Sequence, residues 1–544
     1  MKNIRIGVDL DNTLVCYDRA FLWGAHQLEL LPKSYEGNKR QIRDYLRGRK
    51  GGEEAWQLLQ GQVYGRWVDR AKLFPGVVRF LWRCKQLGVT VEIVSHKSEY
   101  GHGDAGGISL REVALKFLEE AGVYSAESES LLKTVQFFGS RKEKIHCIAQ
   151  KRFDWFIDDL EEIFMSSGFP QGTKKILFCA QWTSGNVVAT QADHWNEIEN
   201  KVLGNWTERE VEYLAGEISG WEIVNSTLLD GGKNSRIARV ETIDGSKAVL
   251  KFYSYDETHD RLFSDFHGSR LMRECGILNT PDPIGYSQDF NVAMFGWIDG
   301  TLVINPDDNC LDQALEFLGN VHSLRQRTSF SEFPNASAAV FSGQDVENQL
   351  RSRFASLQKN TIESGELKRF LLTKLRPSIE RIVSWYRSEW VKEFGYEHLL
   401  ADECRTLSPS DFGFHNALRN REGEIIFIDF EYFGWDDPAK LVGDFVLHPG
   451  MNLTNSQKKH WIKGAEKIFG SIMLRRMSLM WPLLGLCWCL ILLNDFRQDY
   501  FLRRNGSAGE QATINRSRLM HQLARSEQLL GEIQSQYKNI SYVS

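Results

Sequence analysis

Apolar runs alternate with helical patterns over the first two hundred residues. Four runs have the length and continuity of buried strands, at residues 4–8, 89–94, 153–157 and 175–178. Residues 109–121 carry apolar side chains at helical spacing, and Gly122 follows as a signal for the end of a helix. Buried strands that alternate with helices indicate a parallel sheet covered on both faces. The pattern therefore predicts an α/β domain over residues 1–203, with a mostly helical insert at about 19–73.

The second half of the chain has a different pattern. Strand-rich sequence with hairpin signals comes first, over about residues 221–297. Long helical patterns, a strand pair around 407–430 and further helices follow to the end of the chain. The pattern predicts a second, α+β domain over residues 204–544, whose larger and mainly helical part begins at about residue 298.

The longest apolar stretch, residues 479–493, is interrupted by Pro482. It is shorter than the roughly 20 residues that span a bilayer, so we predict a buried helix and no membrane partner. The first residues turn acidic without a cleavage site, which argues against a signal peptide. Nine scattered cysteines indicate free thiols in a reducing compartment. We therefore expect a cytoplasmic protein.

Composition narrows the class of protein further. With 42% hydrophobic residues and 12 prolines in 544 residues, the chain is not a largely disordered one. The 66 Lys and Arg against 71 Asp and Glu give a formal charge of −5, which argues against wholesale nucleic-acid binding.

The first candidate site comes directly after the first predicted strand, where Asp9, Asp11 and Thr13 stand. In an open α/β sheet, ligands bind beyond the carboxyl ends of the strands. One carboxylate there can attack as a nucleophile, while the other protonates a leaving group and later activates water. Alternatively, the pair only caps a turn.

Further polar residues follow the other predicted strands. Ser95 ends the second strand, and the third strand ends in Asp158 and Asp159. Lys142 and Lys144 precede that third strand, and the sequence leaves open which of them serves the site. Carboxylates suit Mg²⁺, and a lysine offsets carboxylate and phosphate charge.

In these motifs, residues 1 to about 200 resemble the haloacid dehalogenase-like phosphohydrolases. The resemblance implies a Rossmann-like parallel sheet with a small helical cap. It also implies Asp9 as nucleophile, Asp11 as acid and base, and a Mg²⁺ site drawn from Asp9, Asp11, Asp158 and Asp159. The second aspartate of the first motif favours phosphatases over dehalogenases.

The insert at 19–73 would be the cap. Its residues 39–50 contain six cations and one acid. They would form either an electropositive lid that attracts a phosphorylated substrate or merely a solvated helix face.

The second half has its own candidate residues. Gly231, Gly232, Asn234 and Ser235 lie between strand-like runs, and Lys251 ends the next run. A glycine-rich hairpin can place backbone N–H groups over phosphates, and a lysine one strand later can pair with them. By itself, such a turn is more often only a hairpin.

Asp411, Asn416 and Asp429 have the spacing of a kinase catalytic apparatus. The first would orient and deprotonate an acceptor hydroxyl, and the other two would hold Mg²⁺ against the phosphates of ATP. With the glycine loop and Lys251, residues 222–500 resemble the aminoglycoside phosphotransferase and choline kinase-like family.

That resemblance implies a two-lobed, protein-kinase-like domain with ATP between its lobes. The adenine would lie near residues 294–297, so Phe295 is a candidate contact. Pro409 stands where the family usually has a histidine. The partner of Lys251 is normally a glutamate on a helix, and here the best-placed candidate is Asp265.

Together the motifs predict a Mg²⁺-dependent phosphatase-like domain fused to an ATP-dependent small-molecule kinase. The substrates would be phosphorylated and hydroxylated small molecules, with a sugar or sugar phosphate as acceptor and surface-polysaccharide precursor synthesis as one pathway by analogy. Two active sites in one chain suggest consecutive steps, because each site is then present at a high effective concentration for the product that the other site releases. The alternatives are an aminoglycoside-type antibiotic kinase, a nucleic-acid end-processing kinase and phosphatase, and a binding protein built on an inactive kinase.

Overall fold

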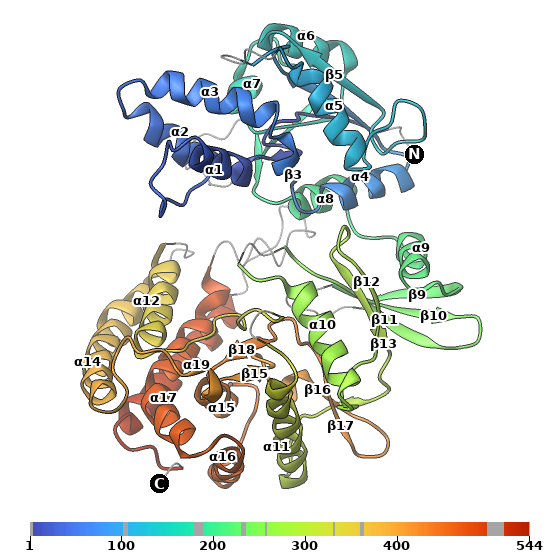
Figure 1. Cartoon of the computed structure of the whole chain (residues 1–544). Coiled ribbons are helices and arrows are strands. Elements are labelled where there is room, and N and C mark those ends of the chain that lie inside the picture. Colours follow the sequence, from blue (N-terminus) through green and yellow to red (C-terminus); the bar gives the residue numbers. More distant parts are fainter. Residues whose placement is uncertain are drawn as a thin grey trace. The chain divides into compact units, whose positions relative to one another are not determined.

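The computed structural model describes residues 4–101, 107–178, 189–229, 236–255, 258–329, 332–359, 364–497 and 516–542. The chain divides into two compact units, Met1–Glu210 and Val211–Ser544. Both units combine helices and strands (Figure 1).

The N-terminal unit contains a six-stranded sheet in which every pair of neighbours is parallel. Its strands, in spatial order, are β5 (Thr134–Phe138), β4 (Thr90–His96), β1 (Arg5–Val8), β6 (Trp155–Asp158), β7 (Lys174–Phe178) and β8 (Thr190–Ala192). The four strands that the apolar runs predict are present. The pattern did not predict β5 and β8, which form the two edges of the sheet. All five residues of β5 are only half-buried, and β8 has three residues, two of them polar, so neither strand shows a continuous apolar run.

Along the described chain, apart from the helices of the insert, four helices lie between these strands: α4 (Val77–Gln86), α5 (Leu110–Glu120), α6 (Arg141–Lys151) and α7 (Glu161–Met165). A further helix, α8 (Trp195–Leu203), follows β8, the last strand of the sheet. The signal for the end of α5 acts as predicted, and Ser109 caps the start of this helix. Ser109 Oγ accepts the N–H of Glu112 at 3.3 Å at the start, and Gly122 takes a left-handed φ of 69° after the end. The next helix, α9 (Glu208–Ser219), crosses the division between the units.

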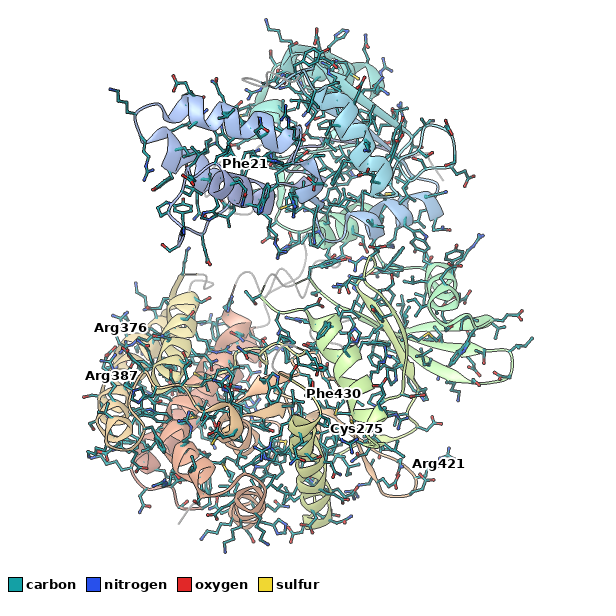
Figure 2. The ribbon with its side chains drawn as sticks, viewed as in Figure 1. Phe21, Cys275, Arg376, Arg387, Arg421 and Phe430 are labelled. Atoms are coloured by element: carbon teal, nitrogen blue, oxygen red, sulfur yellow. The ribbon has the colours of Figure 1, made fainter. Side chains whose placement is uncertain are left out.

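The insert after β1 is mostly helical, as predicted. Two short strands, β2 (Val15–Cys16) and β3 (Lys72–Leu73), pair in antiparallel fashion at the two ends of the insert. Its helices are α1 (Asp18–Gln27), α2 (Lys39–Arg47), α3 (Gly52–Tyr64) and η1 (Val68–Arg70). Phe21 of α1, labelled in Figure 2, stacks on Trp56 of α3 with ring centroids 5.0 Å apart. An aromatic centre of its own therefore holds this cap together.

The C-terminal unit begins with a five-stranded antiparallel sheet. In spatial order, its strands are β12 (Pro283–Ser287), β13 (Val292–Gly296), β11 (Lys247–Phe252), β10 (Arg236–Thr242) and β9 (Ile223–Leu229). Helix α10 (Arg261–Glu274) packs against β12 and β13 (Figure 1). Phe266 on this helix contacts the Phe295 ring at a centroid distance of 6.1 Å.

The rest of this unit is mainly helical. Its helices are α11 (Asp308–Ser323), η2 (Leu324–Gln326), α12 (Gly343–Lys359), α13 (Gly365–Phe370), the π-helix η3 (Leu371–Leu375), α14 (Arg376–Glu393), η4 (Asp402–Cys404), η5 (Phe414–Asn416), α15 (Pro438–Leu447), α16 (Asn455–Phe469), α17 (Ser471–Leu492), η6 (Leu493–Phe496) and α19 (Arg516–Gln536). Two small antiparallel sheets accompany them. One has the order β14 (Thr301–Leu302), β16 (Ala417–Arg419) and β17 (Ile425–Phe427), and the other pairs β15 (Thr406–Ser408) with β18 (Gly434–Asp436).

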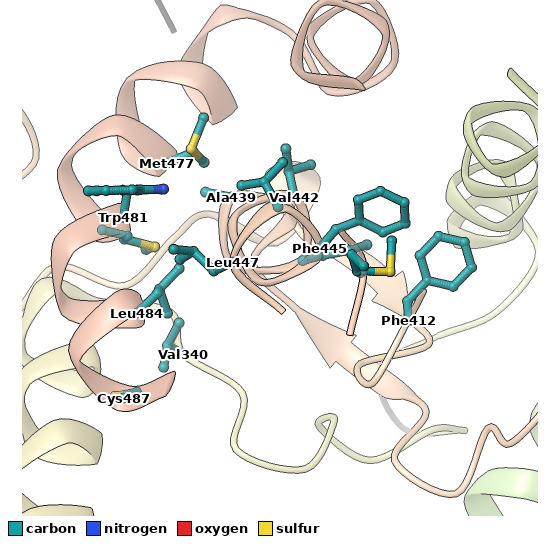
Figure 3. Close-up of a cluster of buried hydrophobic side chains, with 14 of the residues drawn as sticks. Val340, Phe412, Ala439, Val442, Phe445, Leu447, Met477, Trp481, Leu484 and Cys487 are labelled. Atoms are coloured by element: carbon teal, nitrogen blue, oxygen red, sulfur yellow. The ribbon is translucent and has the colours of Figure 1, made fainter. Parts of the chain in front are cut away.

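The core of this part is the contact between α15 and α17, which Figure 3 shows in close-up. A Cβ at Gly443 would lie 2.8 Å from Leu484 Cδ1, so glycine there allows the two helices to approach closely. Among the described residues, one helical segment, Ser471–Phe496, is long and apolar enough to cross a membrane, and 72% of its most apolar window is buried inside the protein. The predicted apolar helix is therefore a core element of this unit.

Candidate functional site

Two carboxylates follow β1 of the N-terminal unit. The backbone N–H of Asp9 donates to Ile157 O at 2.9 Å, so Asp9 lies at the carboxyl ends of both β1 and β6. Asn12 adopts a φ of 61°, and its N–H donates to Val15 O at 2.9 Å, which turns the chain sharply after Asp11. The parallel strands thus bring Asp9 to the residues that follow β6.

A buried lysine connects the two strand ends. Lys144 Nζ on α6 lies 2.6 Å from Asp9 Oδ1 and 2.6 Å from Asp158 Oδ2. Burial disfavours the cation, but these two carboxylates raise the pKa of Lys144 above its usual value. Lys142, two residues earlier on the same helix, is exposed. Of the two lysines that the sequence leaves open, the structure brings Lys144 into the cluster and leaves Lys142 outside it.

Asp9, Asp158 and Asp159 each offer an oxygen, and these oxygens lie within 4.8 Å of one another. Burial raises the pKa of Asp158 to about 6, and burial together with the charges of Asp9 and Asp158 raises that of Asp159. Three carboxylates with Lys144 leave an excess of negative charge, which a divalent cation with a preference for oxygen would offset. The cluster therefore fits the expected Mg²⁺ site.

Two hydroxyls beside these strands are buried and have no hydrogen-bond partner among the described residues. They are Ser95 Oγ on β4, whose residue is 1% exposed, and Thr13 Oγ1, whose residue is fully buried. An unpaired buried polar group costs about 1–3 kcal/mol, so a native protein usually keeps one where a ligand binds. Both residues belong to the predicted motifs, and both suit the oxygens of a phosphoryl group.

The structure gives Asp11 partners that sequence reasoning did not assign. Lys97 Nζ donates to both of its carboxylate oxygens at 2.9 and 2.8 Å, and the Tyr17 hydroxyl donates at 2.8 Å. Burial opposes ionisation, but Lys97 and Tyr17 together hold the pKa of Asp11 below its usual range. The Asp11 carboxylate therefore lies outside the group of three that fits a metal. The available signal was the position of Lys97, two residues after Ser95.

The basic segment of the cap divides into two parts. Most of its cations are exposed, and Arg43 and Arg47 pair with Asp44 and Glu53. Lys39 instead turns inward and contacts groups beside Asp11, and burial lowers its pKa. The solvated helix face is therefore the better description of the segment, except at Lys39.

In the C-terminal unit, Lys251 occupies the centre of a second charged cluster. Its Nζ lies 2.5 Å from Asp265 Oδ2 on α10, 2.5 Å from Asp429 Oδ1 and 3.6 Å from Glu431 Oε2. Burial disfavours the cation, but the three carboxylates raise the pKa of Lys251. The Tyr253 hydroxyl also donates to Asp265 Oδ2, at 2.8 Å. Asp265 thus has the position that the resemblance requires of the partner of Lys251.

The three predicted catalytic-loop residues lie around the β16–β17 hairpin. Asn416 Nδ2 donates to Asp411 O at 2.9 Å, and the N–H of Ile428 donates to Asn416 O at 2.9 Å. Asp429 follows β17 with a φ of 70°, an unusual backbone conformation for a non-glycine residue. The hairpin therefore brings Asn416 next to the strand end that carries Asp429. An amide and a carboxylate oxygen there suit Mg²⁺.

A histidine that sequence reasoning missed contacts Asp411. His415 Nε2 lies 3.1 Å from Asp411 Oδ1, and the His415 ring stacks on His448 with centroids 3.8 Å apart. Burial opposes ionisation of Asp411, but the contact with His415 outweighs it and lowers the pKa of that carboxyl. Pro409 occupies the position of the usual histidine, so the histidine partner of Asp411 here comes from the residue before Asn416.

Of the remaining predicted nucleotide contacts, Phe295 lies within the described residues. Gly231, Gly232, Asn234 and Ser235 lie outside the described residues. The Phe295 side chain is 3% exposed and packs in an apolar cluster beneath the sheet, with Tyr253, Leu262, Phe266 and Ala293. The structure therefore does not present the Phe295 ring to a ligand.

In the comparison with known protein families, the matched residues lie in the C-terminal unit. Residues 226–464 match the family model described as the phosphotransferase enzyme family, APH. The matched range lies in the C-terminal unit and contains the cluster around Lys251 and the loop that carries Asp411. No curated protein matches the sequence. On this family match, the C-terminal unit contains a kinase-like phosphotransferase domain.

Three similar solved structures are also of phosphotransferases or kinases. Spectinomycin phosphotransferase APH(9)-Ia, in complex with ADP and spectinomycin, is 13% identical, with 61% of this chain and 99% of that chain covered and a TM-score of 0.43. The choline kinase LicA from Streptococcus pneumoniae is 12% identical, with 60% and 98% covered and a TM-score of 0.40. The amicoumacin kinase hAmiN, in complex with AMP-PNP, Ca²⁺ and Ami, is 14% identical, with 61% and 96% covered and a TM-score of 0.41.

Proposed function

We propose that the protein is a bifunctional enzyme, with an ATP-dependent small-molecule kinase in residues 204–544 and a Mg²⁺-dependent phosphatase in residues 1–203. The observation that carries the kinase is the cluster of Lys251, Asp265 and Asp429, combined with Asp411 and Asn416 beside the same hairpin. The match of residues 226–464 to a phosphotransferase family supports it.

In the kinase, Lys251 holds the phosphates of ATP, and Asp265 fixes the lysine. Asn416 and Asp429 would hold Mg²⁺, which neutralises phosphate charge when bound. Asp411 accepts the proton of the acceptor hydroxyl. The acceptor oxygen then bonds to the γ-phosphorus, the bond from that phosphorus to the bridging oxygen breaks, and ADP leaves. His415 keeps Asp411 ionised and therefore able to act as a base.

The acceptor is a hydroxyl of a sugar or sugar phosphate in this proposal, and synthesis of surface-polysaccharide precursors is a pathway that uses such chemistry. The similar proteins are named for small molecules, namely spectinomycin, choline and amicoumacin. ATP consumption across a panel of sugars, sugar phosphates, choline, aminoglycosides and oligonucleotides tests it. Turnover that depends only on an aminoglycoside or an oligonucleotide would replace the sugar assignment, and no turnover would favour an inactive kinase that only binds ligands.

The observation that carries the phosphatase is the position of Lys144 between Asp9 and Asp158 at the carboxyl ends of β1 and β6. Beside it lie the hydroxyls of Thr13 and Ser95, which have no hydrogen-bond partner in the part of the chain that the structure describes. The Asp9 carboxylate attacks phosphorus, and the ester oxygen leaves with a proton from the protonated form of Asp11. Because Lys97 and Tyr17 favour the ionised form of Asp11, substrate binding must weaken these contacts before Asp11 can donate. Asp11 then takes a proton from the water that releases phosphate from the aspartyl-phosphate. A Mg²⁺ ion held by Asp9, Asp158 and Asp159 would lower the cost of bringing two anions together.

Release of phosphate from simple phosphate esters, measured with Mg²⁺ and with EDTA, tests the phosphatase. We expect hydrolysis only with Mg²⁺, because the charge of three carboxylates otherwise repels the substrate. Equal rates in both conditions would contradict the metal assignment.

A further inference from the structure

One cation of the cap is directed toward the carboxylates of the N-terminal unit. Lys39 begins α2, and its backbone N–H donates to Asp18 Oδ1 at 2.8 Å, which ties the helix start to α1. Its Nζ donates to Asn12 Oδ1 at 3.0 Å and to the Tyr64 hydroxyl at 2.6 Å. Since Asn12 directly follows Asp11, the Lys39 ammonium lies at the border between the cap and the site.

The three lysines around this site differ in their partners. Lys144 and Lys97 each form an ion pair with a carboxylate, at 2.6 and 2.8 Å. Lys39 forms no ion pair with any carboxylate of the described residues. Its hydrogen-bond acceptors are two neutral oxygens, and its Nζ also lies 5.3 Å from the centroids of the Phe21 and Tyr64 rings. Asp11 and Asp159 act on this ammonium only through space, and burial still lowers the pKa of Lys39. A half-buried ammonium with no carboxylate in direct contact is costly, and an anion of the ligand in contact with it would reduce that cost.

The remaining groups of the site that could bind an anion are those that would contact the transferred phosphoryl group. Lys144 and the hydroxyls of Thr13 and Ser95 belong to the strand ends that carry Asp9. Lys39 and Tyr64 come from the cap, a separate part of the fold with its own pair of strands and aromatic centre. The site therefore has a second set of donors for a part of the substrate other than the transferred group.

We propose that Lys39, with the Tyr64 hydroxyl and the Asn12 amide, binds a second anionic group of the substrate. The N-terminal unit then acts on phosphate monoesters that carry a carboxylate or a further phosphate near the ester. This inference rests on the phosphatase activity proposed above for the same site.

Two pairs of substrates test it on the full chain with Mg²⁺. 3-Phosphoglycerate and glycerol 3-phosphate differ only in a carboxylate against a hydroxymethyl group, and fructose 1,6-bisphosphate and fructose 1-phosphate differ only in a phosphate. The measured quantity is the preference, the ratio of kcat/KM within each pair. In one pair or both, we expect a preference for the substrate that carries a second anionic group, and the pair that shows the preference identifies that group.

Lys39→Gln should lower that preference by about 10- to 100-fold, mainly through KM, because a charge-assisted hydrogen bond is lost from a binding group. Lys39→Arg should keep part of the preference. Tyr64→Phe is a second variant that removes only one hydroxyl, and we expect a smaller loss of preference. Arg40→Gln is the matched control, since Arg40 is the next residue of α2 and is exposed, and its preference should equal that of the wild type.

The outcomes separate this inference from the phosphatase proposal. If the wild type hydrolyses none of the four esters while it is folded, the phosphatase proposal fails and the subsite falls with it. If the wild type hydrolyses them without preference, or if Lys39→Gln slows all four equally, the phosphatase stands and the second-anion subsite is wrong.

Discussion

Each unit holds a lysine between two aspartates, but the two arrangements differ in burial. In the N-terminal unit, the Lys144 side chain is 2% exposed, and its partners Asp9 and Asp158 are 8% and 0% exposed. In the C-terminal unit, the Lys251 side chain is 12% exposed, and its partner Asp429 is 38% exposed. The cluster around Lys144 is preformed at the carboxyl ends of β1 and β6. The cluster around Lys251 instead joins a strand to Asp429, which is 178 residues later in the chain and more exposed to solvent.

The difference indicates how each site would receive a phosphate. Asp9 is already in contact with the lysine that would stabilise the transferred group, so little rearrangement is needed. In the C-terminal unit, the Lys251–Asp429 contact occupies the groups that ATP and Mg²⁺ would use, so ligand binding must replace it. The following predictions test whether the two sites act separately and whether the two units are stabilised separately.

The largest effect is expected at the preformed cluster. Asp9→Asn should lower hydrolysis of a phosphate ester by at least about 10⁴-fold, because an amide oxygen is a poor nucleophile for phosphorus. Phosphate release by the full chain with Mg²⁺ measures this, and ATP-dependent phosphorylation by the same variant is the control. Hydrolysis at the wild-type rate would show that the motif is misassigned.

A matched pair on α6 sharpens that result. Lys144→Met should also remove hydrolysis, because it leaves the Asp9 and Asp158 charges uncompensated. Lys142→Met should retain the wild-type rate, since Lys142 is exposed. The opposite result would exchange the roles of the two lysines.

The next largest effect concerns the kinase. Asp411→Ala should lower ATP-dependent phosphorylation by about 10²–10⁴-fold, the usual contribution of a positioned general base. Asp429→Ala should reduce it at least as much, because it removes a proposed Mg²⁺ ligand. Phosphate release from an ester should stay at the wild-type rate in both variants. If a folded Asp411→Ala protein also lost hydrolysis, the two sites would be coupled and not independent.

A core substitution tests whether the units unfold separately. Leu484→Ala on α17 removes a side chain that is 1% exposed and should lower the free energy of unfolding of the C-terminal unit by about 2–5 kcal/mol. Ile472→Ala, at an exposed position of the same helix, should change it by less than about 0.5 kcal/mol. Denaturant unfolding followed by both enzyme activities should show early loss of kinase activity alone. Simultaneous loss of both activities would mean that the units unfold as one.

The smallest effect is a pH dependence of the C-terminal unit. Burial, with a smaller contribution from Arg325, lowers the pKa of His322 to about 4, from 6.5. The unfolded chain therefore binds more protons than the folded one between these values, so stability from this group is present above pH 6.5 and is lost as the pH falls toward 4. We expect a loss of about 1–3 kcal/mol in the free energy of unfolding. His322→Gln should flatten this dependence, and an unchanged slope would assign it to other groups.

Sequence reasoning succeeded where chain order alone dictates proximity. Asp9, Ser95 and Asp158 each come directly after an apolar run that predicts a strand, and the carboxyl ends of parallel strands lie on the same side of their sheet. The resemblance to the kinase family also pointed to Asp265 as the best-placed partner of Lys251, and the structure places its carboxylate 2.5 Å from that lysine. The edge strands β5 and β8 were not predicted, because β5 is only half-buried and β8 is short and mostly polar.

Which side chains meet was decided by the tertiary structure. Lys142 and Lys144 are two residues apart on one helix, and only its packing on the sheet turns Lys144 inward. Lys39 reaches Asn12 because the cap folds back over the end of β1, a contact between segments of separate hydrophobic patterns. His415 contacts Asp411 through the turn of a loop, and Phe295 is withdrawn into the core by its neighbours. Periodicity along the chain determines which residues are buried and at which strand end they stand, whereas the partner of each charge depends on how distant segments pack.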